Sequence, residues 1–285
     1  MIFKFHSPAK LNLFLKIKNR RKDGFHNLET IFERINLCDE IRISINNSGV
    51  IKIYSDRPIC PLKSNLAYQA ALLIKNKFHI EAGINIKIKK IIPIGAGLGG
   101  ASSNAATVIL ALNKIFRLKL SLGELLNLAR IIGSDVSFFV LNSRFALGLG
   151  RGDRLTPILK HKNIKFWHVL VAPYFKNLTS KMYHKFDDYL RLTKEAQSVK
   201  IKCLKIRQIN KNFLKNNLFN SFESIVDPRI MRIKDKFSQL NVKYRLMSGS
   251  GSAVFGIVNS RKEADNIYKQ LKKGKVGQVY IVKTY

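Results

Sequence analysis

Cysteine, tryptophan and acidic residues are scarce in this sequence of 285 residues, which has 3 Cys, 1 Trp and 18 Asp and Glu. The three cysteines, Cys38, Cys60 and Cys203, are far apart and form no C-x-x-C pair. This spacing excludes a disulfide framework and a cysteine-based zinc site. We therefore expect three reduced thiols, in the core or at the surface.

Long apolar runs are also absent. The apolar stretch at 169–173 is much shorter than the ~18 apolar residues that cross a membrane. Residues 1–8 lack the charged region, the apolar region and the small-residue cleavage site of a signal peptide. We therefore expect a protein without a membrane partner, located in the cytoplasm of a bacterium. A processed protein of the plastid stroma is the alternative.

Basic residues greatly outnumber acidic ones, because 51 Lys and Arg against 18 Asp and Glu give a net charge of +33. Such an excess is typical of proteins that bind nucleic acid. The excess is spread over the whole chain, however, and the sequence is rich in Lys, Ile and Asn together. We therefore interpret the charge as a genome-wide codon bias and expect a small-molecule substrate rather than a nucleic-acid partner. The sequence does not indicate the oligomeric state.

The length predicts one large domain or two of about 140 residues each. A glycine-rich turn at 148–152 and Pro157 interrupt the pattern of regular segments. We therefore expect an N-terminal lobe over residues 1–156 and a C-terminal lobe over 157–285.

Hydrophobic periodicity predicts an α+β protein. Strands are expected at 10–17, 41–45, 50–54, 84–88, 168–172, 252–258 and 276–282. Helices are expected at 66–74, 104–116, 121–132, 228–240 and 262–272. The alternating segments 41–45 and 50–54 are interpreted as a pair of strands, and Ser121 with Glu124 is interpreted as the capped start of a helix.

A glycine-rich segment, PIGAGLGGASSNAA at 93–106, lies between a predicted strand and a predicted helix. The backbone N–H groups of such a loop and the N-terminus of the helix both attract an anion, so we predict a phosphate site. The spacing of Gly95, Gly97 and Gly100 matches a dinucleotide fingerprint, but the acidic residue at the end of a following strand is missing. The Walker A lysine and the protein-kinase motifs are missing as well.

The segment is similar to the phosphate loop of the GHMP kinases, named after galactokinase, homoserine kinase, mevalonate kinase and phosphomevalonate kinase. Three more segments resemble the branch that phosphorylates 4-diphosphocytidyl-2-C-methyl-D-erythritol: SPAKLNLFL at 7–15, DGFHNLET at 23–30 and GSDVSFF at 133–139. A fourth segment, SGSGSAVF at 248–255, resembles the C-terminal glycine loop of the family. The resemblance spans most of the chain, and residues 175–215 match least. It implies a two-lobed α+β fold of the GHMP-kinase type with the active site in the cleft between the lobes.

The same resemblance implies a reaction and the residues that perform it. The γ-phosphoryl group of ATP would pass to the 2-hydroxyl of the acceptor, in the non-mevalonate (methylerythritol phosphate) route to isoprenoid precursors. Asp135 would receive the proton of that hydroxyl, with Lys10 beside it. The ATP-binding residues would be Pro93, Ile94, Gly95, Ala96, Gly97, Leu98, Gly99, Gly100, Ala101, Ser102 and Ser103. Mg²⁺ is expected with the triphosphate, on the hydroxyl of Ser102 or Ser103 or on protein ligands that the resemblance does not identify.

For the acceptor, the resemblance implies that Asn12 contacts the methylerythritol end and that His26 hydrogen-bonds the edge of the cytosine. The ring of Phe25, which stands where the family has Tyr, would stack on the base, because stacking needs only an aromatic face. Tyr183 would cover the opposite face of the base. These four residues form the expected acceptor site.

Two other positions depart from the family pattern. Ala101 replaces a Gly of the phosphate loop, and Ser137 replaces a Pro in the turn expected to present Asp135. Neither change removes a reacting group.

The sequence leaves two alternative functions. The first alternative is another small-molecule kinase of the superfamily, against which the pair Phe25 and His26 argues. The second is an inactive kinase fold that binds nucleic acid, against which Lys10, Asp135 and the intact loop argue.

Overall fold

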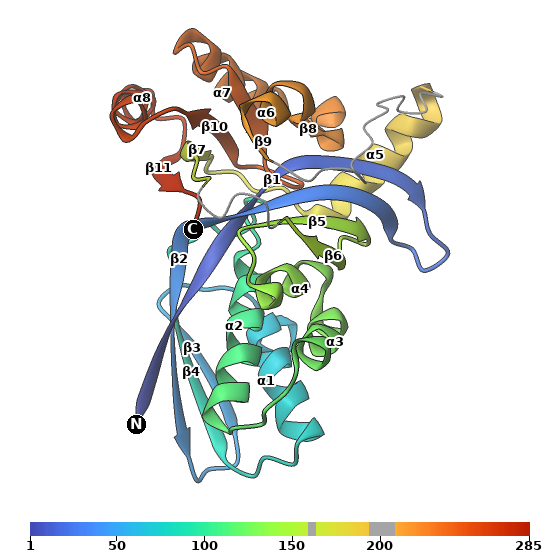
Figure 1. Cartoon of the computed structure of the whole chain (residues 1–285), viewed down its shortest axis with the longest axis vertical. Helices are drawn as coiled ribbons and strands as arrows, with labels where there is room; N and C mark the ends of the chain where they lie inside the picture. The colour runs from blue at the N-terminus through green and yellow to red at the C-terminus, as the bar shows by residue number, and fades with distance from the viewer. Residues whose placement is uncertain (159–163, 194–208) are drawn as a thin grey trace.

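A computed structural model of the chain describes residues 1–158, 164–193 and 209–285 (Figure 1). Two β-sheets form its framework. The strands of the first sheet are β1 (Ile2–Arg20), β2 (His26–Asn46), β3 (Ile51–Ser55), β4 (Gly83–Lys89), β5 (Phe145–Gly150), β6 (Arg154–Pro157) and β8 (Phe219–Asn220). The strands of the second sheet are β7 (Trp167–Ala172), β9 (Tyr244–Met247), β10 (Val254–Val258) and β11 (Gln278–Lys283). The first sheet runs in the order β3-β4-β2-β1-β8, and the second in the order β11-β7-β10-β9.

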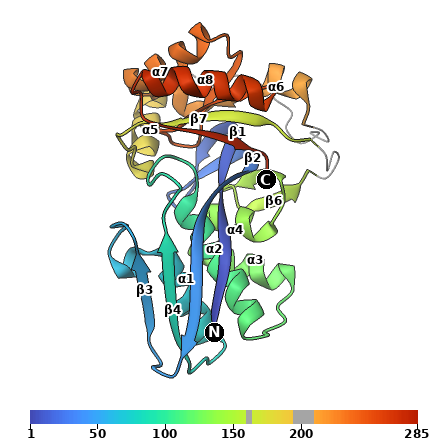
Figure 2. The ribbon, with the colours of Figure 1, turned by 90° about the vertical axis from the view of Figure 1, so that its left-hand side faces the viewer.

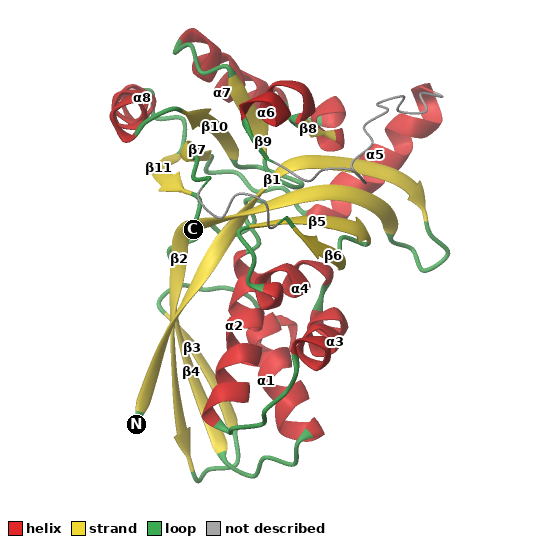
Figure 3. Cartoon of the chain, in the orientation of Figure 1, coloured by secondary structure: helices red, strands yellow, loops and turns green. Residues whose placement is uncertain are grey.

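Helices cover one face of each sheet, as the colouring in Figure 3 shows. The helices beside the first sheet are α1 (Leu66–Lys77), α2 (Gly100–Ile115), α3 (Leu122–Ile132) and α4 (Ser134–Leu141). The later helices are α5 (Thr179–Thr193), α6 (Lys211–Asn217), α7 (Pro228–Gln239) and α8 (Arg261–Lys273). Figure 2 shows α7 and α8 lying over the second sheet, away from the first. The long strands β1 and β2 run from the N-terminus at one end of the molecule to the second sheet at the other (Figure 1).

The expected strand pair 41–45 and 50–54 is wrong in one respect. Both segments join the first sheet, but β4 lies between them, and Ile86 pairs with Ile43 on one side and with Ile53 on the other. The reason is the helix α1, which follows β3 and carries the chain back, so that β4 adds to the sheet parallel to β3. Period-two patterning identifies strands but does not select their neighbours.

The capped start expected at residue 121 is confirmed. The Ser121 hydroxyl accepts a hydrogen bond from the Glu124 backbone N–H, and the Glu124 carboxylate accepts one from the Ser121 backbone N–H. These two bonds satisfy N–H groups that a helix start leaves without partners, so α3 begins where the sequence places it.

The predicted lobe boundary falls at the end of β6, and every strand of the second sheet follows it. The chain nevertheless returns to the first sheet in β8, where Phe219 pairs with Phe14 of β1. Across the sheets, the buried carboxylate of Glu33 accepts hydrogen bonds from His168 Nε2 and Thr284 Oγ1 at 2.9 and 2.6 Å. The two halves are therefore joined by backbone and side-chain bonds, and the division at residue 156 stays a prediction.

Within the described part of the chain, none of the helices has the length and apolar character needed to span a bilayer. Cys38 and Cys60 are free thiols, as expected. The expectation for Cys203 lies outside the described residues.

Candidate active site

A cavity of about 680 Å³ opens where the two sheets approach each other. Its wall combines the middle of β1, the phosphate loop, the start of α4, helix α5 and the turn at 248–252. This volume lies in the range of sites that hold a small molecule. Of the sequence-predicted site residues, all but Ser103 line the cavity.

The phosphate loop forms one part of the cavity wall. Gly95, Gly97 and Gly99 have positive φ angles, and α2 begins at the residue after Gly99. The N-terminus of α2, with its free N–H groups, therefore faces the space in which we expect the phosphates. A Cβ atom at Gly97 would overlap the carbonyl oxygen of Ser248. Only glycine permits this approach between the phosphate loop and the turn at 248–252.

Hydrogen bonds hold these two loops together. Ser248 Oγ donates to the carbonyl oxygen of Gly97 at 3.1 Å, and the backbone N–H of Ala253 donates to the carbonyl oxygen of Ala96 at 3.1 Å. Asn220 Nδ2 donates to the carbonyl oxygen of Gly249 at 2.8 Å. The phosphate loop is thus shaped partly by residues about 150 positions later in the chain.

The two serines of the loop differ in position. Ser102 lines the cavity. Ser103 is fully buried, and its Oγ accepts a hydrogen bond of 2.8 Å from Ser7 Oγ. Of the two serines considered for phosphate or magnesium, only Ser102 lines the cavity.

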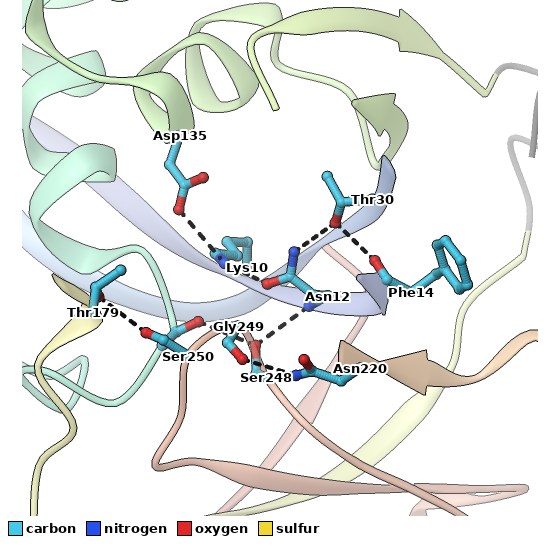
Figure 4. A network of polar contacts seen from close by, with 11 residues as sticks. Lys10, Asn12, Phe14, Thr30, Asp135, Thr179, Asn220, Ser248, Gly249 and Ser250 are labelled. Carbon is cyan, nitrogen blue, oxygen red and sulfur yellow. Dashed lines mark hydrogen bonds and ion pairs between the residues drawn. The ribbon is translucent and has the colours of Figure 1, made fainter. Parts of the chain in front are cut away.

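Lys10 stands at the centre of a polar network (Figure 4). Its side chain is 5% exposed, and Nζ lies 3.5 Å from Asp135 Oδ2 and donates to Asn12 Oδ1. Asn12 Nδ2 in turn donates to Thr30 Oγ1 at 2.7 Å, which fixes the orientation of the amide. The ammonium group therefore has a defined place between a carboxylate and an amide oxygen.

Asp135 occupies the first turn of α4, whose positive end stabilises a carboxylate. Its side chain is 37% exposed, and Figure 4 shows it directed toward Lys10. The prediction of a turn around Ser137 is wrong. Residues 134–141 form a helix, and the Ser137 side chain is buried. The helix, rather than a turn, presents Asp135 to the cavity.

The predicted acceptor residues gather at another part of the wall. His26, at the start of β2, is 6% exposed, and its ring stacks on that of Tyr183 with centroids 5.0 Å apart. Burial raises the pKa of the Tyr183 phenol, and the nearby negative charge of Asp135 adds to the rise. Phe25 is 52% exposed, and the guanidinium of Arg151 lies 5.0 Å from its ring centre. The rings of Phe25 and Tyr183 thus line the same cavity as Lys10, the first in contact with Arg151 and the second stacked on His26.

Comparison with known proteins agrees with this geometry. Residues 65–143 match the GHMP kinases N terminal domain, and residues 204–276 match the GHMP kinases C terminal domain. Proteins named 4-diphosphocytidyl-2-C-methyl-D-erythritol kinase from Bacillus velezensis and Syntrophus aciditrophicus are 36% and 35% identical to the chain. These alignments cover 97% and 99% of this chain and 95% and 99% of the relatives. The chain belongs to this kinase family.

Solved structures agree with the family at the level of the fold. The crystal structure of a 4-(cytidine 5′-diphospho)-2C-methyl-D-erythritol kinase has a TM-score of 0.81 at 29% identity and covers 99% of this chain and 98% of its own. A mevalonate kinase from L. major, at 18% identity, has a TM-score of 0.72, covers 99% of this chain and 95% of its own, and shares the fold. The expected two-lobed α+β GHMP-kinase fold is confirmed, and the chain is a small-molecule kinase.

Sequence reasoning missed several residues of the cavity in this kinase. Lys90 lines it and forms a buried ion pair with Asp39, which also accepts the backbone N–H groups of Ile91 and Ile92. Asp187 contacts His26, and Thr30 orients Asn12. Nothing in the sequence distinguishes Lys90 among 51 basic residues except its place three residues before Pro93.

Proposed function

We propose that this kinase transfers the γ-phosphoryl group of ATP to the 2-hydroxyl of 4-diphosphocytidyl-2-C-methyl-D-erythritol, in the non-mevalonate route to isoprenoid precursors. The observation that carries the proposal is the place of the pair Lys10 and Asp135. The pair lines the same cavity as the phosphate loop and as the aromatic wall of Phe25 and Tyr183. One cavity therefore offers a phosphate site, a proton acceptor and a surface for a pyrimidine.

Asp135 is the proposed base. A hydroxyl placed between its carboxylate and the phosphate loop would lose its proton to Asp135 as it attacks the γ-phosphorus. Lys10, held by Asn12 and Asp135, places its ammonium group where negative charge develops on the transferred group. The backbone N–H groups at the start of α2 hold the remaining phosphate oxygens.

Mg²⁺ is proposed to arrive with the triphosphate. Among the described residues, no three His, Cys, Asp or Glu side chains are grouped as a dedicated metal centre requires. This fits Mg²⁺, which keeps much of its water and is bound through substrate phosphates and one or two side chains. Ser102 lines the cavity, and its hydroxyl is the side-chain oxygen of the phosphate loop that would hold the ion. The ion would neutralise phosphate charge during the transfer.

The adenine of ATP is proposed to lie beyond the start of the phosphate loop. There the cavity is lined by the apolar side chains of Ile59, Leu66 and Ile88 together with Asn65 and Lys90. The Lys90 ammonium lies 3.3 Å from where a Cβ atom of Gly100 would stand, so it reaches the beginning of α2. An apolar pocket with a few polar groups next to a phosphate site suits a purine nucleotide.

The proposed reaction is tested by ADP release with ATP and Mg²⁺, with the cytidine substrate, homoserine, mevalonate and phosphomevalonate as separate acceptors. Turnover with the cytidine compound alone is expected. Turnover with a different acceptor only would keep the kinase activity and replace the substrate. Absence of turnover with all four, together with salt-dependent binding of RNA, would favour the nucleic-acid alternative. A cytoplasmic location is part of the same proposal.

Thiol reactivity tests where the nucleotide binds. Cys60 is exposed and lines the adenine part of the cavity. Burial, and then the charge of Asp39, raises the pKa of the Cys38 thiol to about 11. Only the thiolate reacts, and at pH 8 about one in 1000 Cys38 side chains is a thiolate. Iodoacetamide at pH 8 is therefore expected to modify Cys60 and to leave Cys38 almost unmodified. The rate at Cys38 should rise about tenfold per pH unit below 11.

Bound ATP with Mg²⁺ should slow the labelling of Cys60 and leave that of Cys38 unchanged. Mass spectrometry of the separated peptides measures both rates. Equal labelling of Cys60 with and without saturating ATP would contradict the proposed adenine position.

A further inference from the structure

Asp187 is a charged residue of the cavity wall to which the proposed reaction gives no role. It lies in α5, and its Oδ1 is 2.6 Å from Nε2 of His26, 161 positions away in the sequence. Its other oxygen lies 3.9 Å from Nη1 of Arg20. Arg20 ends β1 and His26 begins β2, and the two residues pair across these strands. One carboxylate of α5 therefore contacts both sides of the β1–β2 turn.

Tyr183 precedes Asp187 by one helical turn and so lies on the same face of α5. Its ring stacks on the imidazole of His26, at an interplanar angle of 17°. The ring of Tyr183 also packs against that of Phe222 in a T-shaped arrangement, with centroids 5.0 Å apart. Helix α5 thus contacts the same imidazole on its face through Tyr183 and on its edge through Asp187.

These contacts determine which ring nitrogen carries a proton. An ionised carboxylate only accepts hydrogen bonds, so Nε2 of His26 must donate to Asp187. In a neutral imidazole the other nitrogen, Nδ1, is then an acceptor. An acceptor matches the 4-amino group of cytosine, which donates, and opposes the 4-oxo group of uracil, which accepts.

We propose that Asp187 is a positioning residue that makes this site select cytosine over uracil. It holds the His26 imidazole in one orientation and one tautomer, and leaves Nδ1 to accept from the 4-amino group of the base. The inference rests on the proposed function, because that function places a cytidine nucleotide beside His26.

The test compares the affinities of cytidine diphosphate and uridine diphosphate, measured by calorimetry, for the wild-type chain and three variants. Wild type is expected to bind the cytidine nucleotide about tenfold more tightly, the effect of one hydrogen bond at a buried site. Asp187→Ala should bind it about tenfold more weakly and the uridine nucleotide with unchanged affinity, so that the preference disappears. Asp187→Asn, whose amide oxygen still accepts from Nε2–H, should keep a reduced preference and rules out an effect of volume alone.

Asp188→Ala is the matched control. Asp188 is the next residue of α5, is 59% exposed and pairs with Arg191 rather than with the cavity wall. This variant should retain the wild-type preference, and none of the variants should change the KM for ATP. A wild-type preference in Asp187→Ala, or an equal loss of affinity for both nucleotides and for ATP, would overturn the role of Asp187.

Failure of the proposed function and failure of the role of Asp187 give different experimental results. A wild-type chain that does not phosphorylate the cytidine substrate overturns the proposed function and this inference with it. A wild-type chain that turns it over, with an Asp187→Ala variant that still distinguishes cytosine from uracil, overturns this inference alone.

Discussion

Replacing Asp135 by Asn is expected to lower kcat by about 1000-fold while the KM values for ATP and the acceptor change less than threefold. The amide keeps the size of the carboxylate but does not accept the proton of the attacking hydroxyl, and general base catalysis contributes roughly 10²–10⁴-fold to a rate. Its oxygen still accepts from Lys10, so the network of Figure 4 should keep its geometry. The loss should therefore appear in turnover and not in binding.

Initial rates at varied ATP and acceptor concentrations, with calorimetry for acceptor binding, measure this prediction. Asp265→Asn is a suitable control, because Asp265 is an exposed residue of α8 that pairs with Arg261 outside the cavity. A near-normal kcat in Asp135→Asn would remove Asp135 from the role of base. Loss of acceptor binding instead would assign it to substrate positioning.

Replacing Gly97 by Ala is expected to lower kcat/KM for ATP by about 100-fold. A Cβ atom at this position overlaps the Ser248 carbonyl oxygen and lies 3.0 Å from that of Gly251, and both obstacles are backbone. The φ angle of +76° adds strain for any residue with a side chain. Either the phosphate loop or the turn at 248–252 must move, and a displacement of about 1 Å in a phosphoryl-transfer site costs about 100-fold in rate.

Gly123→Ala provides the control for Gly97→Ala. Gly123 lies in α3, and the nearest atom to an added Cβ is Ser121 Oγ at 3.9 Å. That change should stabilise the chain by up to about 1 kcal/mol, because alanine favours a helix over glycine, and it should leave kinetics unchanged. Thermal unfolding separates a misplaced loop from a misfolded chain. Wild-type kinetics in folded Gly97→Ala would show that the two loops are not held in fixed contact.

Local features of the fold were predictable because their causes are local. Helix α3 begins at Ser121 because two side chains close a capping box three residues apart. The phosphate loop was recognisable because its glycines, its hydroxyls and the following helix are contiguous. The neighbours of a strand were not predictable in this way. The insertion of β4 between β2 and β3 depends on the path of α1, which no period-two pattern records.

The residues of the candidate site were likewise predictable only where a local sequence motif contains them. Lys10, Asp135, His26 and the loop were found through motifs, each of which is a continuous stretch of sequence. Asp187 was missed because α5 carries no motif and its partner is 161 residues away. Ser102 and Ser103 are chemically identical neighbours. Their places on α2 put Ser102 in the cavity wall and bury the Ser103 hydroxyl against Ser7.

The sequence by itself determined the kind of chemistry, since it holds a glycine-rich phosphate loop, a lysine, a carboxylate and an aromatic–histidine pair in the order of one kinase family. Only the tertiary structure decided which of these groups meet. The long strands β1 and β2 carry Lys10 and His26 to the junction of the two sheets, where α4 and α5 supply Asp135 and Asp187. The physical reason is that side chains distant in sequence approach only when the packing of buried sheets and helices places their backbones together.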